Sequence, residues 1–198
     1  MDKQIALNLA QTQGAFLTSI RGIGLILAAG VTAEIGDISQ QKPLNNLASY
    51  AGIVPRVKQT GGVNGKTHTG PVAKRCNRIL KDYVVKSAYH LGLHGPDDLM
   101  ADYKRRDASG QHADFGIGRR YLRMAISLMR TSHVYLPPYL RKDEYSVNDR
   151  AGYYMITWPY FRDKWKKVGA LEAAFATDRP LGIWRQIVQQ LYDIELNF

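Results

Sequence analysis

The sequence predicts a mainly α fold with a basic glycine-rich loop near its middle and an aromatic-rich tail at its C-terminus. Helices are predicted because apolar residues recur at three- and four-residue spacings over several stretches. The loop is predicted from the glycines and basic residues between residues 52 and 70, and the tail from the twelve of twenty aromatic residues that lie beyond residue 135. With 198 residues, 45% of them hydrophobic, the chain can bury one or two ordinary cores.

Two helical segments joined by a tight turn are expected at the N-terminus. Residues 1–17 are expected to be the end of a connecting helix, and residues 19–24 to form the turn. The helix that follows should end near Gly36, because glycine commonly terminates helices. The apolar residues at helical spacing in these segments are Ile5, Leu9, Phe16, Ile23, Ile26, Leu27 and Val31.

A long helix is expected from Pro71 to about Leu93, since proline is tolerated in a first helical turn. A short helix over residues 44–52 and the glycine-rich loop precede it. Further helices are expected from near Pro96 and from about Gln111 to Arg130. The apolar face of the long helix would comprise Val72, Cys76, Ile79, Leu80, Tyr83, Val84, Ala88 and Leu91, and a basic row suited to a phosphate backbone would comprise Lys74, Arg78 and Lys81.

The domain organisation follows from these elements. Residues 18–135 are expected to form one helical domain, and the "LPPYL" segment at 136–140 separates it from the tail at 136–198. The aromatic residues of the tail could stack on bases, form a small core or form a partner interface.

Charge is concentrated in one segment. The net charge is +10, and no Asp or Glu occurs between Ile38 and Lys81. Such a local field attracts a polyanion, and nucleic acid is the usual one. Two alternatives remain open: a solvated basic face that only aids solubility, and a helical interaction protein whose basic face is incidental. The eight positive residues of this segment are Lys42, Arg56, Lys58, Lys66, Lys74, Arg75, Arg78 and Lys81.

The stretch "TGGVNGKTHTG" at residues 60–70 contains Gly65-Lys66-Thr67, which resembles the end of a nucleotide-binding loop. A Walker A loop requires a glycine five positions before Gly65, and that position is Thr60. It also requires a buried strand before the loop, whereas "VPRVKQ" is highly charged. The basic loop therefore indicates phosphates of another kind, which we expect to be those of DNA.

The stretch "IRGIG" at residues 20–24 has the form of a helix-hairpin-helix turn. Gly22 and Gly24 allow the backbone to approach a phosphate closely, and the next helix begins with free N–H groups. This pattern is typical of DNA-backbone binding, although an ordinary interhelical turn fits it equally well.

Several motifs together resemble one family. The segments "LTSIRGIGLILAAGVTAEIGDI", "LASYAGIVPR", "QTGG", "KRCNRILK" and "GQHADF" are similar to the C-terminal domain of the insertion sequence 110, 116 and 902 transposases, related to Piv-like DNA recombinases. That resemblance implies DNA binding and strand transfer in transposition or site-specific recombination. The alternative is a non-catalytic nucleic-acid-binding module, or a decayed transposase remnant.

The resemblance also implies partners and a cofactor. In that family a RuvC-like nuclease domain precedes this one and holds Mg²⁺ on four carboxylates, and a structured RNA guides the choice of DNA. No cofactor is therefore expected in this chain, and Mg²⁺ is expected only with a RuvC-like domain. The expected partners are DNA, a guide RNA, and either a second copy of the chain or a RuvC-like domain. Without that domain, the chain is expected to be inactive.

The resemblance implies one catalytic residue. The family's nucleophilic serine before glycine corresponds to Thr60 here, where the hydroxyl is kept and a methyl group is added. The neighbouring cations could stabilise a phosphoryl transition state. The residues predicted to bind DNA are Arg21, Gly22, Gly24, Arg56, Lys58, Lys66, Lys74, Arg75, Arg78 and Lys81.

Other classes of function are disfavoured by the sequence. His90 and His94 stand four apart but lack a third ligand, so no metal site is expected. The single cysteine, Cys76, cannot form an internal disulfide. The longest near-apolar run, "GIGLILAAGV", is about half the length needed to span a bilayer. A cytoplasmic location without membrane attachment is therefore expected.

Overall fold

A computed structural model describes residues 1–38, 44–60, 66–72, 75–142 and 144–172. The expected mainly helical architecture is confirmed. The elements in chain order are α1 (Asp2–Ala10), the 3-10 helix η1 (Gln13–Ser19), α2 (Leu25–Ile35), α3 (Leu44–Tyr50), β1 (Pro55–Thr60), β2 (Lys66–Val72), α4 (Arg78–His94), α5 (Asp97–Ala108), α6 (Ala113–Thr131), the 3-10 helix η3 (Pro138–Arg141) and α7 (Val147–Lys167).

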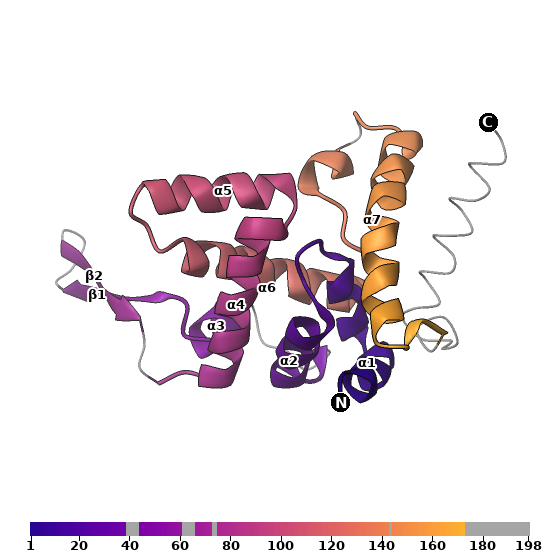
Figure 1. The fold of residues 1–198 in the computed structure, drawn as a ribbon. Coiled ribbons are helices and arrows are strands. Elements are labelled where there is room, and N and C mark those ends of the chain that lie inside the picture. Colours follow the sequence, from indigo (N-terminus) through magenta and orange to yellow (C-terminus); the bar gives the residue numbers. More distant parts are fainter. Residues whose placement is uncertain (39–43, 61–65, 73–74, 143, 173–198) are drawn as a thin grey trace.

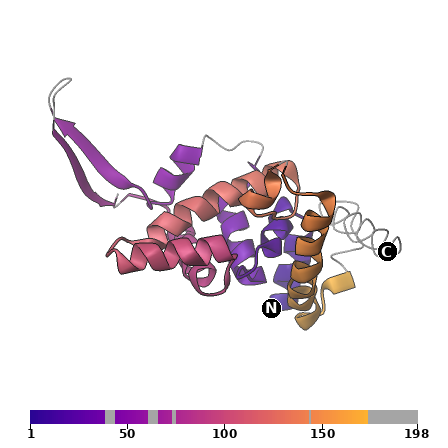
Figure 2. The same ribbon diagram turned by 90° about the horizontal axis from the view of Figure 1, so that it is seen from above.

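The helices pack around α4 and α6, as Figures 1 and 2 show. α4 contacts α2 and α5 as well as α6, while α1 and η1 close the core on the side of α2. Both central helices bury residues at helical spacing, which places their apolar faces against each other. These residues are Leu80, Val84, Ala88 and Leu91 on α4, and Ile117, Tyr121, Leu122, Ala125 and Leu128 on α6.

The expected helix from Pro71 is wrong at its N-terminal end, because α4 begins at Arg78. Asn77 caps the helix by accepting a hydrogen bond from the Leu80 N–H at 3.0 Å. Pro71 and Val72 belong to β2, and Ile79, expected in the core, is exposed. Lys74 lies outside the described residues, and of the expected row of Lys74, Arg78 and Lys81 the structure places Arg78 and Lys81 on α4.

A β-hairpin occupies the region in which an irregular loop was expected. β1 and β2 pair antiparallel, and they make the two-stranded sheet of the described part of the chain. The charges of "VPRVKQ" argue against a buried parallel strand but are compatible with an exposed antiparallel one. The glycines at 61, 62 and 65 lie outside the described residues. Figures 1 and 2 show the hairpin projecting from the helical body, on the side away from α1 and α7.

The described part of the aromatic-rich tail packs on the N-terminal segment. Phe161 and Trp165 of α7 belong to the same hydrophobic core as the helices before them. The ammonium group of Lys164 donates hydrogen bonds to the carbonyl oxygens of Thr18 at 2.8 Å and Ile20 at 3.2 Å. Burial lowers the pKa of Lys164 to about 8. Residues 173–198 lie outside the described part, and the expectation that the tail forms a partner interface stays a prediction.

Candidate nucleic-acid interface

The pairing register of the hairpin gathers its basic residues on one face. Arg56 pairs with Gly70, Lys58 with His68, and Thr60 with Lys66. Directly paired residues share a face, and alternate residues along a strand return to it. One face therefore carries Arg56, Lys58, Thr60, Lys66 and His68, while the opposite face carries Val57, Gln59, Thr67 and Thr69.

The base of the hairpin is fixed by hydrogen bonds to the helical body. The backbone N–H of Asn77 donates to the Tyr50 carbonyl oxygen at 2.8 Å, which joins the chain before β1 to the chain after β2. The side-chain amide of Asn77 also donates to Glu34 Oε2 at 2.7 Å and to the Tyr50 hydroxyl at 2.9 Å. Asn77 thus connects α2, α3 and the start of α4 at one point.

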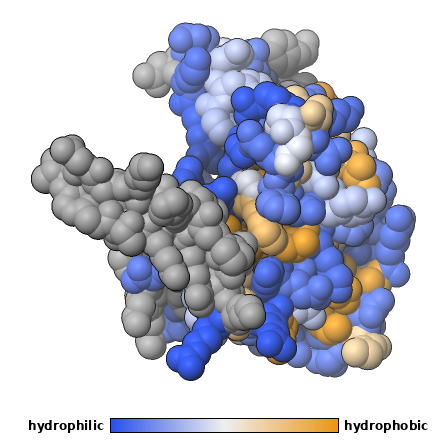
Figure 3. All heavy atoms as spheres, turned by 90° about the vertical axis from the view of Figure 1, so that its left-hand side faces the viewer, coloured by the Kyte–Doolittle hydropathy of each residue, from blue (hydrophilic) through white to orange (hydrophobic). Residues whose placement is uncertain are grey.

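Three further predicted binding residues lie where the hairpin meets α4. Arg75 and Arg78 are exposed. Lys81 is partly buried, and its ammonium group lies 5.3 Å from the ring centroid of Phe115 on α6, in a cation–π contact. Arg75 and Arg78 are therefore available to a polyanion, whereas Lys81 already has an internal partner. Figure 3 views the molecule from the left-hand side of Figure 1 and shows a surface on which hydrophilic residues predominate and hydrophobic patches also occur.

The "IRGIG" turn packs against the C-terminal end of α4 and the residues that follow it. Arg21 donates hydrogen bonds to the Gly95 carbonyl oxygen and pairs with Asp97 at 2.7 Å. Gly22 has φ +91°, and a Cβ atom there would meet the backbone oxygen of His90 at 3.1 Å. The close approach that Gly22 permits is thus to the protein's own backbone. The segment before the turn is the 3-10 helix η1, so the turn joins a 3-10 helix to α2.

Gly24 differs from Gly22. It caps the N-terminus of α2 with φ −86°, and nothing lies within 4 Å of a Cβ atom built on it. The turn contacts the C-terminal end of α4 at His94 and Gly95, whereas the hairpin is anchored at Asn77. α4 has 17 residues, and at 1.5 Å per residue the two groups are about 25 Å apart. They are two separate candidate contacts rather than one cluster.

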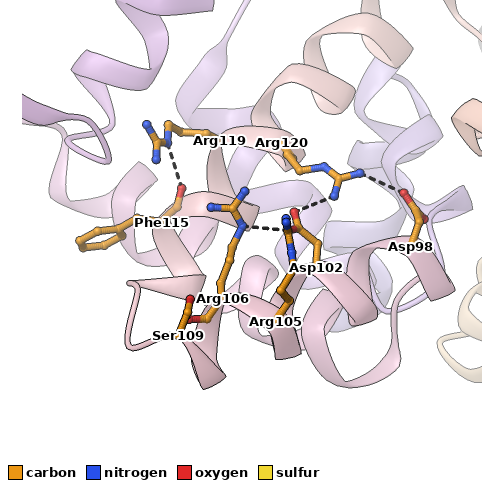
Figure 4. A network of polar contacts seen from close by, with 8 residues as sticks. All are labelled: Asp98, Asp102, Arg105, Arg106, Ser109, Phe115, Arg119 and Arg120. Carbon is orange, nitrogen blue, oxygen red and sulfur yellow. Dashed lines mark hydrogen bonds and ion pairs between the residues drawn. The ribbon is translucent and has the colours of Figure 1, made fainter.

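An arginine network between α5 and α6, shown in Figure 4, was missed in the sequence. Arg120 bridges Asp102 at 2.8 Å and Asp98 at 3.0 Å, while Arg105 and Arg106 also pair with Asp102. Burial raises the pKa of Asp102, but hydrogen bonds from the three arginines outweigh it and hold the pKa at about 2. The spacing of Asp98, Asp102 and Arg106 is a helical i, i+4 pattern that could have indicated the α5 part.

No group of three or more His, Cys, Asp or Glu side chains among the described residues could hold a metal ion. None of the helices in that part of the chain is both long enough and apolar enough to cross a membrane.

The fold and the site are those of a helical domain that carries a projecting basic hairpin. The sequence model of the "Transposase IS116/IS110/IS902 family" matches residues 14–103, a range that includes the turn, the hairpin and α4. Residues 14–103 are therefore similar to this transposase family, in agreement with the resemblance of the motifs.

Two curated relatives agree with this assignment. A protein of Pseudomonas aeruginosa named "Probable family 20 transposase" is 33% identical over 72 residues, covering 36% of this chain and 20% of that protein. The "Insertion element IS116 uncharacterized 44.8 kDa protein" of Streptomyces clavuligerus is 27% identical over 124 residues, covering 61% of this chain and 30% of that protein. The matches thus span less than a third of either relative's length. No solved structure matches the chain significantly.

Proposed function

We propose that this chain binds DNA through the basic face of the β1–β2 hairpin and contributes to strand transfer in transposition, as part of a transposase. The observation that carries the proposal is the register, which assigns Arg56, Lys58, Thr60 and Lys66 to one face. The family match supports the same function because it covers the whole hairpin.

The chemistry of this face suits a phosphodiester. Attack by a hydroxyl group on phosphorus concentrates negative charge on the phosphoryl oxygens, and fixed cations stabilise that charge. Thr60 is the residue of β1 nearest the hairpin tip, and it is paired with Lys66. In the proposed reaction the Thr60 hydroxyl would form the bond to phosphorus while a strand oxygen leaves.

The other components are proposed to come from outside this chain. The described residues offer no carboxylate cluster that fits Mg²⁺, so no step is assigned to a metal on them. A RuvC-like domain, a guide RNA and a second copy of the chain are proposed partners in a complete transposase.

The salt dependence of DNA binding tests the role of the hairpin. Arg56, Lys58 and Lys66 would be replaced together by Gln, and duplex affinity would be measured by fluorescence anisotropy across a salt series. Each phosphate contact contributes about −0.9 to the slope of log affinity against log salt, so losing three should flatten the slope by about 2.7.

The matched control removes three exposed lysines elsewhere, Lys104, Lys142 and Lys166. This variant should flatten the slope of log affinity against log salt much less, because the three lysines do not belong to the hairpin. They lie on α5, after η3 and on α7. If both triple variants change the slope equally, only net charge matters and the hairpin is not the interface. If the hairpin variant loses binding and Thr60 has no role in cleavage, the chain is a non-catalytic binding module.

A further inference from the structure

A pocket lined in part by Arg120 of the arginine network has a composition that the proposed function does not use. It has a volume of about 340 Å³ and lies between α6 and the segment that runs from Tyr135 through η3. Three of its lining residues are arginines, and none is acidic. The lining comprises Arg120, Arg123, Met124, Ser127, Tyr135, Pro138 and Arg141.

The three arginines differ in how far their charges are compensated. Arg120 is paired with Asp98 and Asp102. Arg141 uses its Nε–H to donate to the Leu136 carbonyl oxygen at 2.9 Å, which neutralises no charge. Arg123 is exposed, and it has no hydrogen-bond or ion-pair partner within the described ranges. Two positive charges at this pocket, those of Arg123 and Arg141, therefore lack a paired carboxylate in the described structure.

A buried hydroxyl group adds a second, independent observation. Tyr135 is 1% exposed, and its hydroxyl has no hydrogen-bond partner among the described residues. A buried donor without an acceptor is unfavourable, so a ligand that accepts its hydrogen bond would gain affinity. Burial raises the pKa of Tyr135, and the phenol therefore stays protonated and able to donate at neutral pH.

The surrounding charges indicate where a ligand would sit. Arg120, Arg141 and Asp98 all act electrostatically on the Tyr135 phenol. The Asp98 carboxylate is already bound by Arg120, and it would repel an anion. An anionic ligand is therefore expected on the side of Arg123 and Arg141, where Ser127 supplies another hydroxyl group.

We propose that this pocket binds one phosphate group of a nucleic-acid strand, held by Arg123 and Arg141, with Tyr135 and Ser127 as neutral donors. The volume exceeds that of a phosphate and lies within the range of small-ligand pockets. Met124, Pro138 and the Tyr135 ring provide apolar wall for the attached sugar or base. The strand as the source of the phosphate rests on the proposed function, whereas binding of phosphate itself does not.

The first test uses inorganic phosphate and the whole chain. NMR titration would follow the arginine Nε–H resonances, with chloride at equal ionic strength as reference. The Arg123 and Arg141 signals should shift saturably, and Arg123→Gln or Tyr135→Phe should weaken phosphate binding about tenfold and severalfold, respectively. Arg119→Gln is the matched control, because Arg119 is an exposed arginine on the same helix and does not line the pocket.

The outcomes separate this proposal from the hairpin's role. No saturable shift in the unmodified chain, or equal affinities of the Arg123→Gln and Arg119→Gln variants, would overturn the phosphate site. A second titration with a short single-stranded oligonucleotide tests the source. If Arg123→Gln weakens phosphate binding but not oligonucleotide binding, the pocket takes a free phosphorylated molecule and the strand assignment is wrong. If Lys58→Gln is the only substitution that abolishes oligonucleotide binding, the result bears on the role of the hairpin and not on phosphate binding by the pocket.

Discussion

Trp165 donates a hydrogen bond from its indole Nε1 to Thr18 Oγ1 across 3.2 Å, and this contact joins α7 to the end of η1. Thr18 is fully buried, and its own hydroxyl donates to the Ala15 carbonyl oxygen at 2.6 Å. The adjacent Ser19 accepts a hydrogen bond from the Tyr135 N–H. The segment just before the "IRGIG" turn is therefore fixed by residues more than a hundred positions further along the chain.

Thr18→Val is expected to destabilise the fold by about 1–3 kcal/mol, because it leaves the buried indole N–H without an acceptor. The free energy of unfolding would be measured by urea denaturation. Thr157→Val is the control, since Thr157 is also buried but its hydroxyl bonds only to carbonyl oxygens of its own helix. Equal effects of the two substitutions would show that the link between α7 and η1 contributes little.

The sequence predicted helices far better than it predicted tertiary partners. The ends of α2 at Gly36 and α6 near Arg130 follow from local signals, which act within one turn. The contact of Trp165 with Thr18 depends on two segments 147 residues apart, which no periodicity reveals. An aromatic-rich tail was therefore a correct description of composition but carried no information on packing.

Acid should weaken the link between α5 and α6. The pKa of Asp102 is lowered from 3.8 to about 2, so between these values the unfolded chain binds more protons than the folded one. The stability contributed by Asp102 is complete above about pH 5 and is lost progressively as the pH falls through 3.8 towards about 2. One pKa unit corresponds to about 1.4 kcal/mol, so the loss should be about 2 kcal/mol.

Asp102→Asn should remove this pH dependence and lower the free energy of unfolding at pH 7. The measurement is urea denaturation at several pH values between 2 and 7. Asp107→Asn is the control, because Asp107 lies on the same helix and is exposed. A variant at Asp102 with the same acid sensitivity as the unmodified chain would mean that another carboxylate carries the effect.

The two glycines of the turn are expected to behave differently. Gly22→Ala should destabilise the protein by about 1–3 kcal/mol, since it combines positive φ with backbone contacts at 3.1 and 3.2 Å. Gly24→Ala should fold normally, because the space around it is open. The melting temperatures of both variants check this prediction. An unchanged melting temperature for Gly22→Ala would contradict the close backbone contacts at Gly22.

Because Gly22→Ala should destabilise the protein, only Gly24→Ala can test whether the turn contacts nucleic acid. If the N-terminus of α2 contacts a phosphate, this variant should bind all DNA sequences more weakly by a similar factor, because a Cβ atom keeps the backbone away. Unchanged affinity would make the turn purely structural. This separation was not evident in the sequence, where both glycines fit the same motif and the partner backbone at His90 could not be foreseen.

The hairpin shows why part of the candidate site escaped the sequence analysis. Basic residues alternate with uncharged ones in Arg56-Val57-Lys58-Gln59, and Asn64-Gly65 is a strong hairpin turn signal. These two signals together could have predicted β1 and β2. The resemblance of this segment to a nucleotide-binding loop favoured an irregular loop, and the preference of proline for helix starts favoured a helix from Pro71. Neither signal takes the pairing of strands into account.

Thr60 is the last and most specific prediction. In a protein that also contains the RuvC-like domain, Thr60→Ser should raise DNA cleavage, since the hydroxyl stays and the methyl group that crowds the attack is removed. Thr60→Ala should abolish cleavage while DNA affinity stays the same, because the cations bind and the hydroxyl only reacts. Both are measured by the yield of a covalent protein–DNA adduct on junction DNA.

The register supplies the control for that experiment. Thr67 pairs with Gln59 and Thr69 with Val57, which places both on the face opposite Thr60. Thr67→Ala and Thr69→Ala should therefore leave cleavage intact, although both residues lie in the same hairpin and carry the same functional group. Equal adduct yields from the unmodified and Thr60→Ala proteins would remove Thr60 from the chemistry. Loss of cleavage in Thr67→Ala instead would show that DNA approaches the uncharged face, against the electrostatic argument.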